Sequence, residues 1–216
     1  MNVAIVGAGH VGGNIARQLA RAGHTITVSF ARDNQALQAL AAEIGGRAAT
    51  PSEAVSGSEV VVVSVPWGAI PDALAQAGSL TGKIVIDTTN QFGAGSKPAD
   101  GQTAAAFNAA RMLGTRYTKS FNTLTSAFQA SVARRDPRVV QWLAGDDEAA
   151  KATVAGLIRD AGYEPVDVGG TAGCAVIEAP RRPGSVYGEE YRLAEARLVV
   201  EAVRSGASIP PTPRYA

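Results

Sequence analysis

Three glycines near the N-terminus have the spacing of a phosphate-binding turn. Gly7, Gly9 and Gly12 form the pattern G-x-G-x-x-G directly after an apolar run at residues 3–6. In such a turn the first glycine permits the tight bend, the second lets the backbone approach a pyrophosphate, and the third lets the next helix pack closely. A glycine-rich turn without a ligand is the alternative. Because this turn lies between a predicted strand and a predicted helix, we expect it to bind a dinucleotide. The expected binding residues are Gly7, Ala8, Gly9, His10, Val11 and Gly12.

The end of the second predicted strand indicates which dinucleotide binds. Sites selective for NAD place an Asp or Glu about 20 residues after the glycines, where it accepts from the ribose 2′-hydroxyl. Here Ser29 and Arg32 precede the first carboxylate, Asp33. An arginine can pair with a 2′-phosphate and Ser29 can donate to it, whereas Asp33 is placed to cap the next helix. An exposed surface charge is the alternative interpretation of Arg32. The pattern favours NADP over NAD.

Further candidates follow the strand predicted at residues 60–63. Ligands of a doubly wound sheet lie beyond the carboxyl ends of its strands. Val65, Pro66 and Trp67 occupy that position, and Pro66 ends the strand because it has no amide proton. Trp67 forms either a flat wall of the cleft or part of the core. We assign Val65, Pro66 and Trp67 to the cofactor site.

Polar side chains follow the next two predicted strands. Thr89 and Asn90 come after the strand at residues 84–86, and Asn122 comes after the strand at 116–120. Asn122 can orient a carboxamide or a substrate carbonyl, but it can equally cap the following helix. Turn chemistry explains Thr89 and Asn90 as well as a binding role does. These three residues are candidates for the substrate cleft.

The chain offers no obvious catalytic acid or base. Its two histidines, His10 and His24, lie in the glycine turn and beside the second strand, and His10 is expected to offer its backbone amide. The single cysteine, Cys174, excludes a cysteine-rich metal site and an internal disulfide, and we expect no bound metal. A ketone needs a proton donor, whereas hydride transfer to a planar, electron-poor ring needs mainly stacking and exclusion of water. The catalytic residues stay unassigned, and a planar acceptor is favoured.

Strands and helices alternate along the chain. The first strands are apolar throughout, which is typical of a parallel sheet covered by helices on both faces. Strands are predicted at residues 3–6, 25–29, 60–63, 84–86, 116–120, 138–143 and 164–168. Helices are predicted at residues 11–22, 37–44, 71–77, 102–113, 148–161 and 189–204. We therefore predict an α/β Rossmann-type, doubly wound parallel sheet with a short α/β extension. Residues 1–112 would form the dinucleotide-binding core, and 113–216 would cover the cofactor cleft.

Composition excludes several classes of function. The 216 residues are 46% hydrophobic and 18% charged, as in globular proteins. Lys and Arg number 20 against 19 Asp and Glu, so no basic field favours nucleic acid or an anionic membrane. No uncharged run approaches the ~20 apolar residues of a membrane span, and the N-terminus does not resemble a secretory signal. We expect a soluble, cytoplasmic protein without nucleic-acid or membrane partners.

Several segments resemble one known family. GAGHVGGNIARQLARAGH, VPWGAIPDAL, FNT and AGDDEAAKATVAGLIRDAGYEPVDVGG are similar to segments of the NADPH-dependent coenzyme F-420 reductases. The resemblance covers most of the chain to about Gly170. It implies a homodimer and NADP over the glycine turn, with Ser29 and Arg32 on the 2′-phosphate, although Phe30 and Ala31 interrupt the family's compact Ser-Arg pair. It also implies a deazaflavin stacked on the nicotinamide, near Pro66, Trp67, Thr89, Asn90 and Asn122.

The C-terminal segment TAGCAVIEAPRRPGSVYG departs from the deazaflavin reductases and resembles a bacterial side branch of the family. The expected function is hydride transfer between NADP(H) and a deazaflavin or flavin-like acceptor. Two alternatives stay open: an NADPH-dependent reductase of a quinone or a metal chelate, and a non-catalytic, NADP(H)-binding redox sensor.

Overall fold

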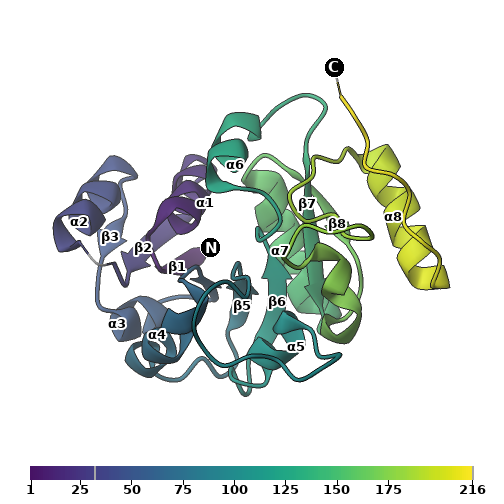
Figure 1. The fold of residues 1–216 in the computed structure, drawn as a ribbon. Coiled ribbons are helices and arrows are strands. Elements are labelled where there is room, and N and C mark those ends of the chain that lie inside the picture. Colours follow the sequence, from purple (N-terminus) through teal and green to yellow (C-terminus); the bar gives the residue numbers. More distant parts are fainter. Residues whose placement is uncertain (32, 216) are drawn as a thin grey trace.

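The structure is a computed structural model that describes residues 1–31 and 33–215 (Figure 1). Within these residues one eight-stranded sheet has the order β3-β2-β1-β4-β5-β6-β7-β8. Neighbouring strands are parallel, except that β6 and β7 are antiparallel. The strands are β1 Asn2–Val6, β2 Thr25–Ser29, β3 Arg47–Ala48, β4 Val60–Val63, β5 Ile84–Asp87, β6 Arg116–Ser120, β7 Val140–Gly145 and β8 Glu164–Asp167.

Helices cover both faces of this sheet (Figure 1). The α-helices are α1 His10–Arg21, α2 Asn34–Glu43, α3 Pro51–Ser56, α4 Ile70–Ala77, α5 Ala104–Ala109, α6 Ser126–Val132, α7 Glu148–Asp160 and α8 Leu193–Ser205. Two 3-10 helices are η1 Trp67–Ala69 and η2 Thr171–Ile177. No helix in the described part of the chain combines the length and the apolar character needed to cross a membrane.

Two apolar layers hold the helices on the sheet. Successive side chains of a strand point to opposite faces, so Val3 and Ile5 of β1 pack in the layer that includes α1, α2, α6 and α7. Ala4 and Val6 pack in the other layer, which includes α3, α4, α5 and α8. The predicted Rossmann-type α/β fold is confirmed, and the strand order reverses between β1 and β4, where such sheets bind their ligands.

The C-terminal half continues the same sheet. β6 pairs with β5, with Ile84 opposite Arg116, and β7 and β8 add two strands of reversed direction beyond it. The segment after β8 returns to the carboxyl end of β5, where the Ala179 amide donates to the Asn90 side-chain oxygen at 3.3 Å. The division into residues 1–112 and 113–216 stays a prediction.

Several elements differ from their predictions. The helix expected at residues 102–113 is shorter, because α5 begins after the N-cap Thr103 and ends at Ala109. β7 begins two residues later and α8 four residues later than expected. β3, α3, η1 and η2 were not predicted, and α6 is the helix expected after Asn122, for which no bounds were predicted. α6 is short and follows the N-cap Thr125, whose hydroxyl accepts from the Phe128 amide at 3.3 Å.

Candidate functional site

The three glycines of the first turn occupy different surroundings. Gly7 has φ +104°, and a Cβ there would clash with the carbonyl oxygen of Ser64 beyond β4. A Cβ at Gly12 would clash with the carbonyl oxygen of Gly7. A Cβ at Gly9 would meet no atom within 4 Å. The fold itself therefore requires Gly7 and Gly12, whereas Gly9 leaves open space above the turn.

The N-terminus of α1 faces that open space. Gly9 is the N-cap of this 12-residue helix, has no side-chain cap and is exposed together with His10. The first turn of α1 contains no acidic residue. The first amides of a helix have no partner within it and carry a partial positive charge. The glycine turn and the first amides of α1 together form an open cradle, which fits a pyrophosphate in both shape and charge.

The end of β2 contains Ser29, which was expected to contact a 2′-phosphate. Ser29 is fully buried, and its hydroxyl donates to the Ile5 carbonyl at 3.2 Å. In this structure the one hydroxyl proton of Ser29 is used inside the sheet, and a contact between Ser29 and a 2′-phosphate stays a prediction. Arg32 lies outside the described residues. Asp33 caps α2 as predicted, since its carboxylate accepts from the amides of Gln35 and Ala36 at 2.8 and 3.2 Å.

The segment after β4 divides into exposed and buried residues. Val65 is buried and lies against the glycine turn, and Pro66 is exposed. Trp67 is buried, stacks on Phe107 at 5.9 Å between ring centroids, and donates its indole proton to the Ser96 carbonyl at 2.8 Å. Of the two interpretations of Trp67, the structure shows core packing, and its assignment to the cofactor site stays a prediction. Its indole anchors the loop that follows β5.

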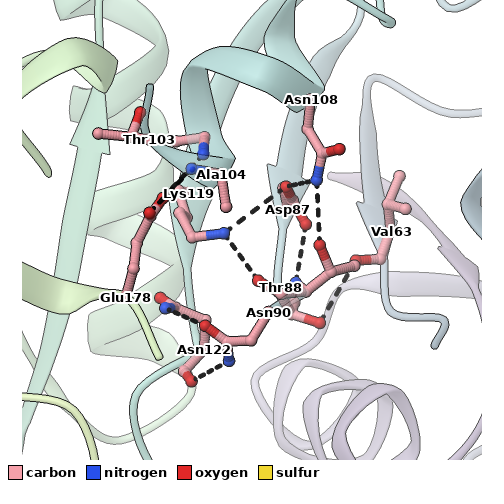
Figure 2. A network of polar contacts seen from close by, with 12 residues as sticks. Val63, Asp87, Thr88, Asn90, Thr103, Ala104, Asn108, Lys119, Asn122 and Glu178 are labelled. Carbon is pink, nitrogen blue, oxygen red and sulfur yellow. Dashed lines mark hydrogen bonds and ion pairs between the residues drawn. The ribbon is translucent and has the colours of Figure 1, made fainter. Parts of the chain in front are cut away.

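A buried polar network lies beneath the carboxyl ends of β5 and β6 (Figure 2). Asp87, at the end of β5, accepts from the Tyr117 hydroxyl at 2.5 Å, the Asn108 amide at 2.9 Å and the Thr89 backbone amide at 2.7 Å. The Lys119 ammonium lies 3.7 Å from the Asp87 carboxylate and donates to the Thr89 carbonyl at 2.7 Å. Burial, followed by the charge of Asp87, raises the pKa of Tyr117 well above its ordinary value. The network therefore fixes the backbone of Thr89 from two sides.

Sequence reasoning did not assign a role to this network. Asp87 is the last residue of the apolar strand β5, and Lys119 lies in the mostly polar strand β6. Both are fully buried, which is rare for charged residues unless they are paired. Their positions near strand ends could be read from the sequence, but the pairing across strands was visible only in the structure.

The substrate-cleft candidates lie close together (Figure 2). The Asn90 amide donates to the Asn122 carbonyl at 2.7 Å, and the Asn122 amide donates to the Asn90 side-chain oxygen at 3.2 Å. The Asn122 amide also donates to the Ile177 carbonyl at 2.7 Å. Thr125, not Asn122, caps α6, so the N-cap interpretation of Asn122 is wrong. The Asn122 side-chain oxygen is buried and has no hydrogen-bond partner among the described residues, so it can accept one further bond.

Glu178 ties the C-terminal segment to α5. Its carboxylate accepts from the amides of Ala104 and Ala105 at 2.8 and 2.7 Å (Figure 2). The Thr103 hydroxyl donates to the Thr171 carbonyl at 2.7 Å beside it. Burial, followed by the charge of Glu178, raises the pKa of the Cys174 thiol to about 12. Cys174 therefore stays a neutral, buried thiol at neutral pH.

The chemistry available at the ends of these strands is that of amides and hydroxyls. Asp87, Lys119 and Glu178 are buried and already paired within the described residues. Among residues 1–31 and 33–215, no group of three or more His, Cys, Asp or Glu side chains is arranged to hold a metal ion. The arrangement can bind an anionic dinucleotide and position a second molecule by hydrogen bonds and packing.

The fold and the glycine turn together define a dinucleotide-binding protein of the Rossmann type. The family described as NADP oxidoreductase, coenzyme F420-dependent, matches residues 2–91, which contain this turn and the ends of β1, β2, β4 and β5. The match confirms the resemblance stated from the sequence over this part of the chain. The matched family is one of NADP-dependent oxidoreductases, the class that the sequence predicted.

Relatives extend the similarity beyond this region. Metalloreductase STEAP3 of Rattus norvegicus is 28% identical over 177 residues, which are 82% of this chain but only 36% of that protein's length. A crystal structure of a hypothetical protein from Sinorhizobium meliloti is 26% identical, with a TM-score of 0.78 over 89% of this chain and 95% of that one. A protein from Arthrobacter sp. FB24, provisionally described as an F420-dependent NADP reductase, is 26% identical, with a TM-score of 0.68 over 79% and 86% of the two chains.

Proposed function

We propose that this protein transfers a hydride from NADPH to a deazaflavin or another flavin-like acceptor. The observation that carries the proposal is the open cradle at Gly9, between two glycines that the fold itself requires. A substitution at Gly9 would leave the turn intact and fill only the space that a pyrophosphate needs. Residues 2–91 match a family of NADP oxidoreductases, so the open space at Gly9 favours NADP(H) as the dinucleotide that binds there.

Residues of this chain would hold the cofactor in three places. The amides at the start of α1 would bind the pyrophosphate, Arg32 would pair with the 2′-phosphate, and Val65 and Pro66 would border the cofactor beyond β4. The contacts of the turn are proposed for Gly7, Ala8, Gly9, His10, Val11 and Gly12. When bound, NADPH supplies a hydride and becomes NADP⁺, while the acceptor gains that hydride on its ring and a proton from solvent.

The polar groups around the cleft support an acceptor that needs no acid from the protein. Asn90 and Asn122 hydrogen-bond to each other, and the charged Asp87 and Lys119 nearby are buried and paired. A planar ring can accept a hydride when it is stacked and shielded from water. Asn122, with its unpartnered oxygen, is the proposed hydrogen-bond acceptor for a carboxamide or ring N–H.

A second candidate function is the reduction of a metal chelate. The similarity to metalloreductase STEAP3 favours this function. This chain spans only 36% of the length of that protein, so the argument applies only to the region that the two proteins share. In this alternative the metal ion is the substrate. A homodimer and a cytoplasmic location are further proposals, which rest on the family resemblance.

Steady-state oxidation of NADPH, followed at 340 nm, tests the function. The acceptors are a 5-deazaflavin, riboflavin, a benzoquinone and a ferric chelate, and the Gly9→Val variant is the control for bound cofactor. We expect turnover with the two tricyclic acceptors and none in Gly9→Val. Turnover with the ferric chelate alone would support the second candidate. Tight NADPH binding without turnover of any acceptor would overturn both.

A further inference from the structure

One aromatic ring at the carboxyl edge of the sheet is exposed without a structural reason. Phe92 is 54% exposed, whereas the other phenylalanines of the chain are buried or half-buried. The Tyr187 ring lies beside it, with ring centroids 6.1 Å apart and an interplanar angle of 59°. The two rings are tilted rather than stacked, and about half of Phe92 stays open to solvent. Removing that face from water would be favourable, and a flat ring of a ligand could do so.

The backbone around Phe92 holds it next to the candidate cleft. The Phe92 amide donates to the Asn90 carbonyl at 2.8 Å, which forms a tight turn directly after the polar residues of β5. The loop that follows is anchored on Trp67, which binds the Ser96 carbonyl at 2.8 Å and contacts Gly95. Phe92 thus lies between two fixed points of the chain.

Tyr187 is held at the same edge by the C-terminal segment. The Gly188 amide donates to the Thr123 carbonyl, three residues beyond the end of β6, at 2.8 Å. The Tyr187 amide donates to the Ser185 hydroxyl at 3.1 Å. Upstream, the Asn122 amide donates to the Ile177 carbonyl at 2.7 Å. Residues 177–188 therefore cross the ends of β5 and β6, and they place Tyr187 beside Phe92.

The expected direction of the bound cofactor indicates from which side an acceptor would reach the nicotinamide. If the pyrophosphate lies at the start of α1 and the 2′-phosphate lies at the end of β2, the nicotinamide must extend the other way, toward β4 and β5. Phe92 follows β5 and lies on that side of the switch point. An acceptor that meets the nicotinamide would therefore approach from the side where Phe92 and Tyr187 lie.

We propose that Phe92 and Tyr187 form the surface on which the planar ring system of the acceptor stacks. The inference rests on the proposed function and adds the residues that would hold the tricyclic ring of its flavin or deazaflavin acceptor. A bulky, non-planar chelate would gain little from an aromatic face, whereas a tricycle covers it fully. Phe92 and Tyr187 both lie outside residues 2–91, which the family match covers.

Direct binding tests the surface independently of turnover. Riboflavin and 5-deazariboflavin are titrated, by the quenching of their fluorescence, into protein saturated with NADP⁺. We expect the dissociation constants of both to rise about tenfold in Phe92→Ala, which corresponds to ~1.4 kcal/mol. Phe92→Tyr should stay within about twofold of the wild type, and Phe92→Leu should fall between them because it keeps apolar area but loses the ring.

Matched controls separate stacking from misfolding. Leu198→Ala removes another large apolar side chain, 52% exposed on α8, and should leave both constants unchanged. NADPH affinity should be the same in Phe92→Ala and the wild type. The inference is overturned if neither tricycle binds the wild type, or if Phe92→Ala binds both as the wild type does. Binding that depends on Phe92 but gives no NADPH oxidation would support the surface and count against the proposed function.

Discussion

Single residues of the glycine turn separate binding from folding. Gly9 has φ −77°, which any residue adopts, and open space around the position of a Cβ. In Gly9→Val we therefore expect the melting temperature to change little while NADPH affinity falls about a hundredfold, or ~2.7 kcal/mol. Isothermal titration and thermal melts measure the two quantities. Gly12→Val is the contrasting variant and should lose stability, since its side chain would clash with the Gly7 carbonyl. Unchanged NADPH affinity in Gly9→Val would place the cofactor elsewhere.

Arg32 is the predicted determinant of NADP over NAD. A charge-assisted contact with the 2′-phosphate contributes about 1.5–3 kcal/mol, so Arg32→Ala should weaken NADPH by roughly ten- to a hundredfold. NADH has no 2′-phosphate and should bind as before. Because Ser29 is buried in the sheet, its removal should not reproduce this selective effect. Paired titrations of NADPH and NADH measure the preference.

Arg47, exposed on the neighbouring β3, is the matched control for Arg32. Arg47→Ala should retain the preference for NADPH. Equal losses of both cofactors in Arg32→Ala would indicate a structural role for Arg32. A preference that disappears only in Arg47→Ala would move the 2′-phosphate to β3.

Among the elements, β6 and α7 are joined by a surface ion pair with a pH signature. Asp147 caps α7 and accepts from the Arg116 guanidinium at 2.6 and 3.0 Å. The Arg116 hydrogen bonds, followed by the one from the Ala150 amide, hold the pKa of Asp147 below its ordinary value. A carboxylate with a lowered folded-state pKa stabilises the protein above its unfolded pKa of about 3.9, and that stability is lost as the pH falls further.

Asp147→Asn tests this ion pair, because asparagine can still cap a helix but cannot carry the charge. We expect the wild type to melt at a higher temperature than Asp147→Asn, by a constant margin from pH 7 down to about 5. The margin should shrink below about pH 4. A margin that does not depend on pH would show that the charge adds nothing to the cap.

The sequence predicted most strands and the glycine turn because their signals are local. Continuous apolar runs marked β1 and β4, and the cap at Asp33 marked the start of α2. Trp67 was ambiguous because its surroundings come from Ser96 and Phe107, far along the chain. The bounds of α6 were not predicted because it has only seven residues, and so short a helix depends on tertiary contacts.

The candidate site was predictable only in part for the same reason. Residues at strand ends could be named, since parallel strands bring their carboxyl ends to one edge. The side chains that join them could not. Asp87 and Lys119 are unremarkable in isolation, and their pairing depends on the register of β5 with β6, in which they lie opposite each other. The burial of Ser29 depends likewise on the carbonyl of Ile5 in the adjacent strand.

At the scale of the whole molecule, the buried Asp87–Lys119 pair joins the two predicted parts of the chain, residues 1–112 and 113–216. Lys119→Met would leave the buried Asp87 without its cation and the Thr89 carbonyl without a donor. Breaking a buried pair by removing one partner costs about 3–5 kcal/mol, so urea unfolding should shift by that amount. We expect one cooperative transition in the wild type, because buried contacts run through both halves.

Two comparisons interpret the Lys119→Met result. Lys97→Met, on the exposed loop after β5, should change the free energy of unfolding by less than about 0.5 kcal/mol. The double variant Asp87→Asn with Lys119→Met should lose less than the sum of the single losses, because it leaves no lone buried charge. Two separate transitions in the wild type would instead support the independent units at 1–112 and 113–216.

Pro165 has a consequence for crowded solutions of this protein. The backbone amides of Glu164 and Val168 point toward β7 and donate to the carbonyls of Val139 and Leu143 at 2.9 Å. Because amides along a strand point alternately to its two sides, the backbone nitrogen of Pro165 faces the open edge of the sheet. Proline has no N–H, so a strand of another copy cannot accept a hydrogen bond from this position. The opposite edge strand, β3, is only two residues long. With a net charge of +1, electrostatic repulsion between copies is weak. Resistance to fibril growth therefore depends on the two blunt edges of the sheet.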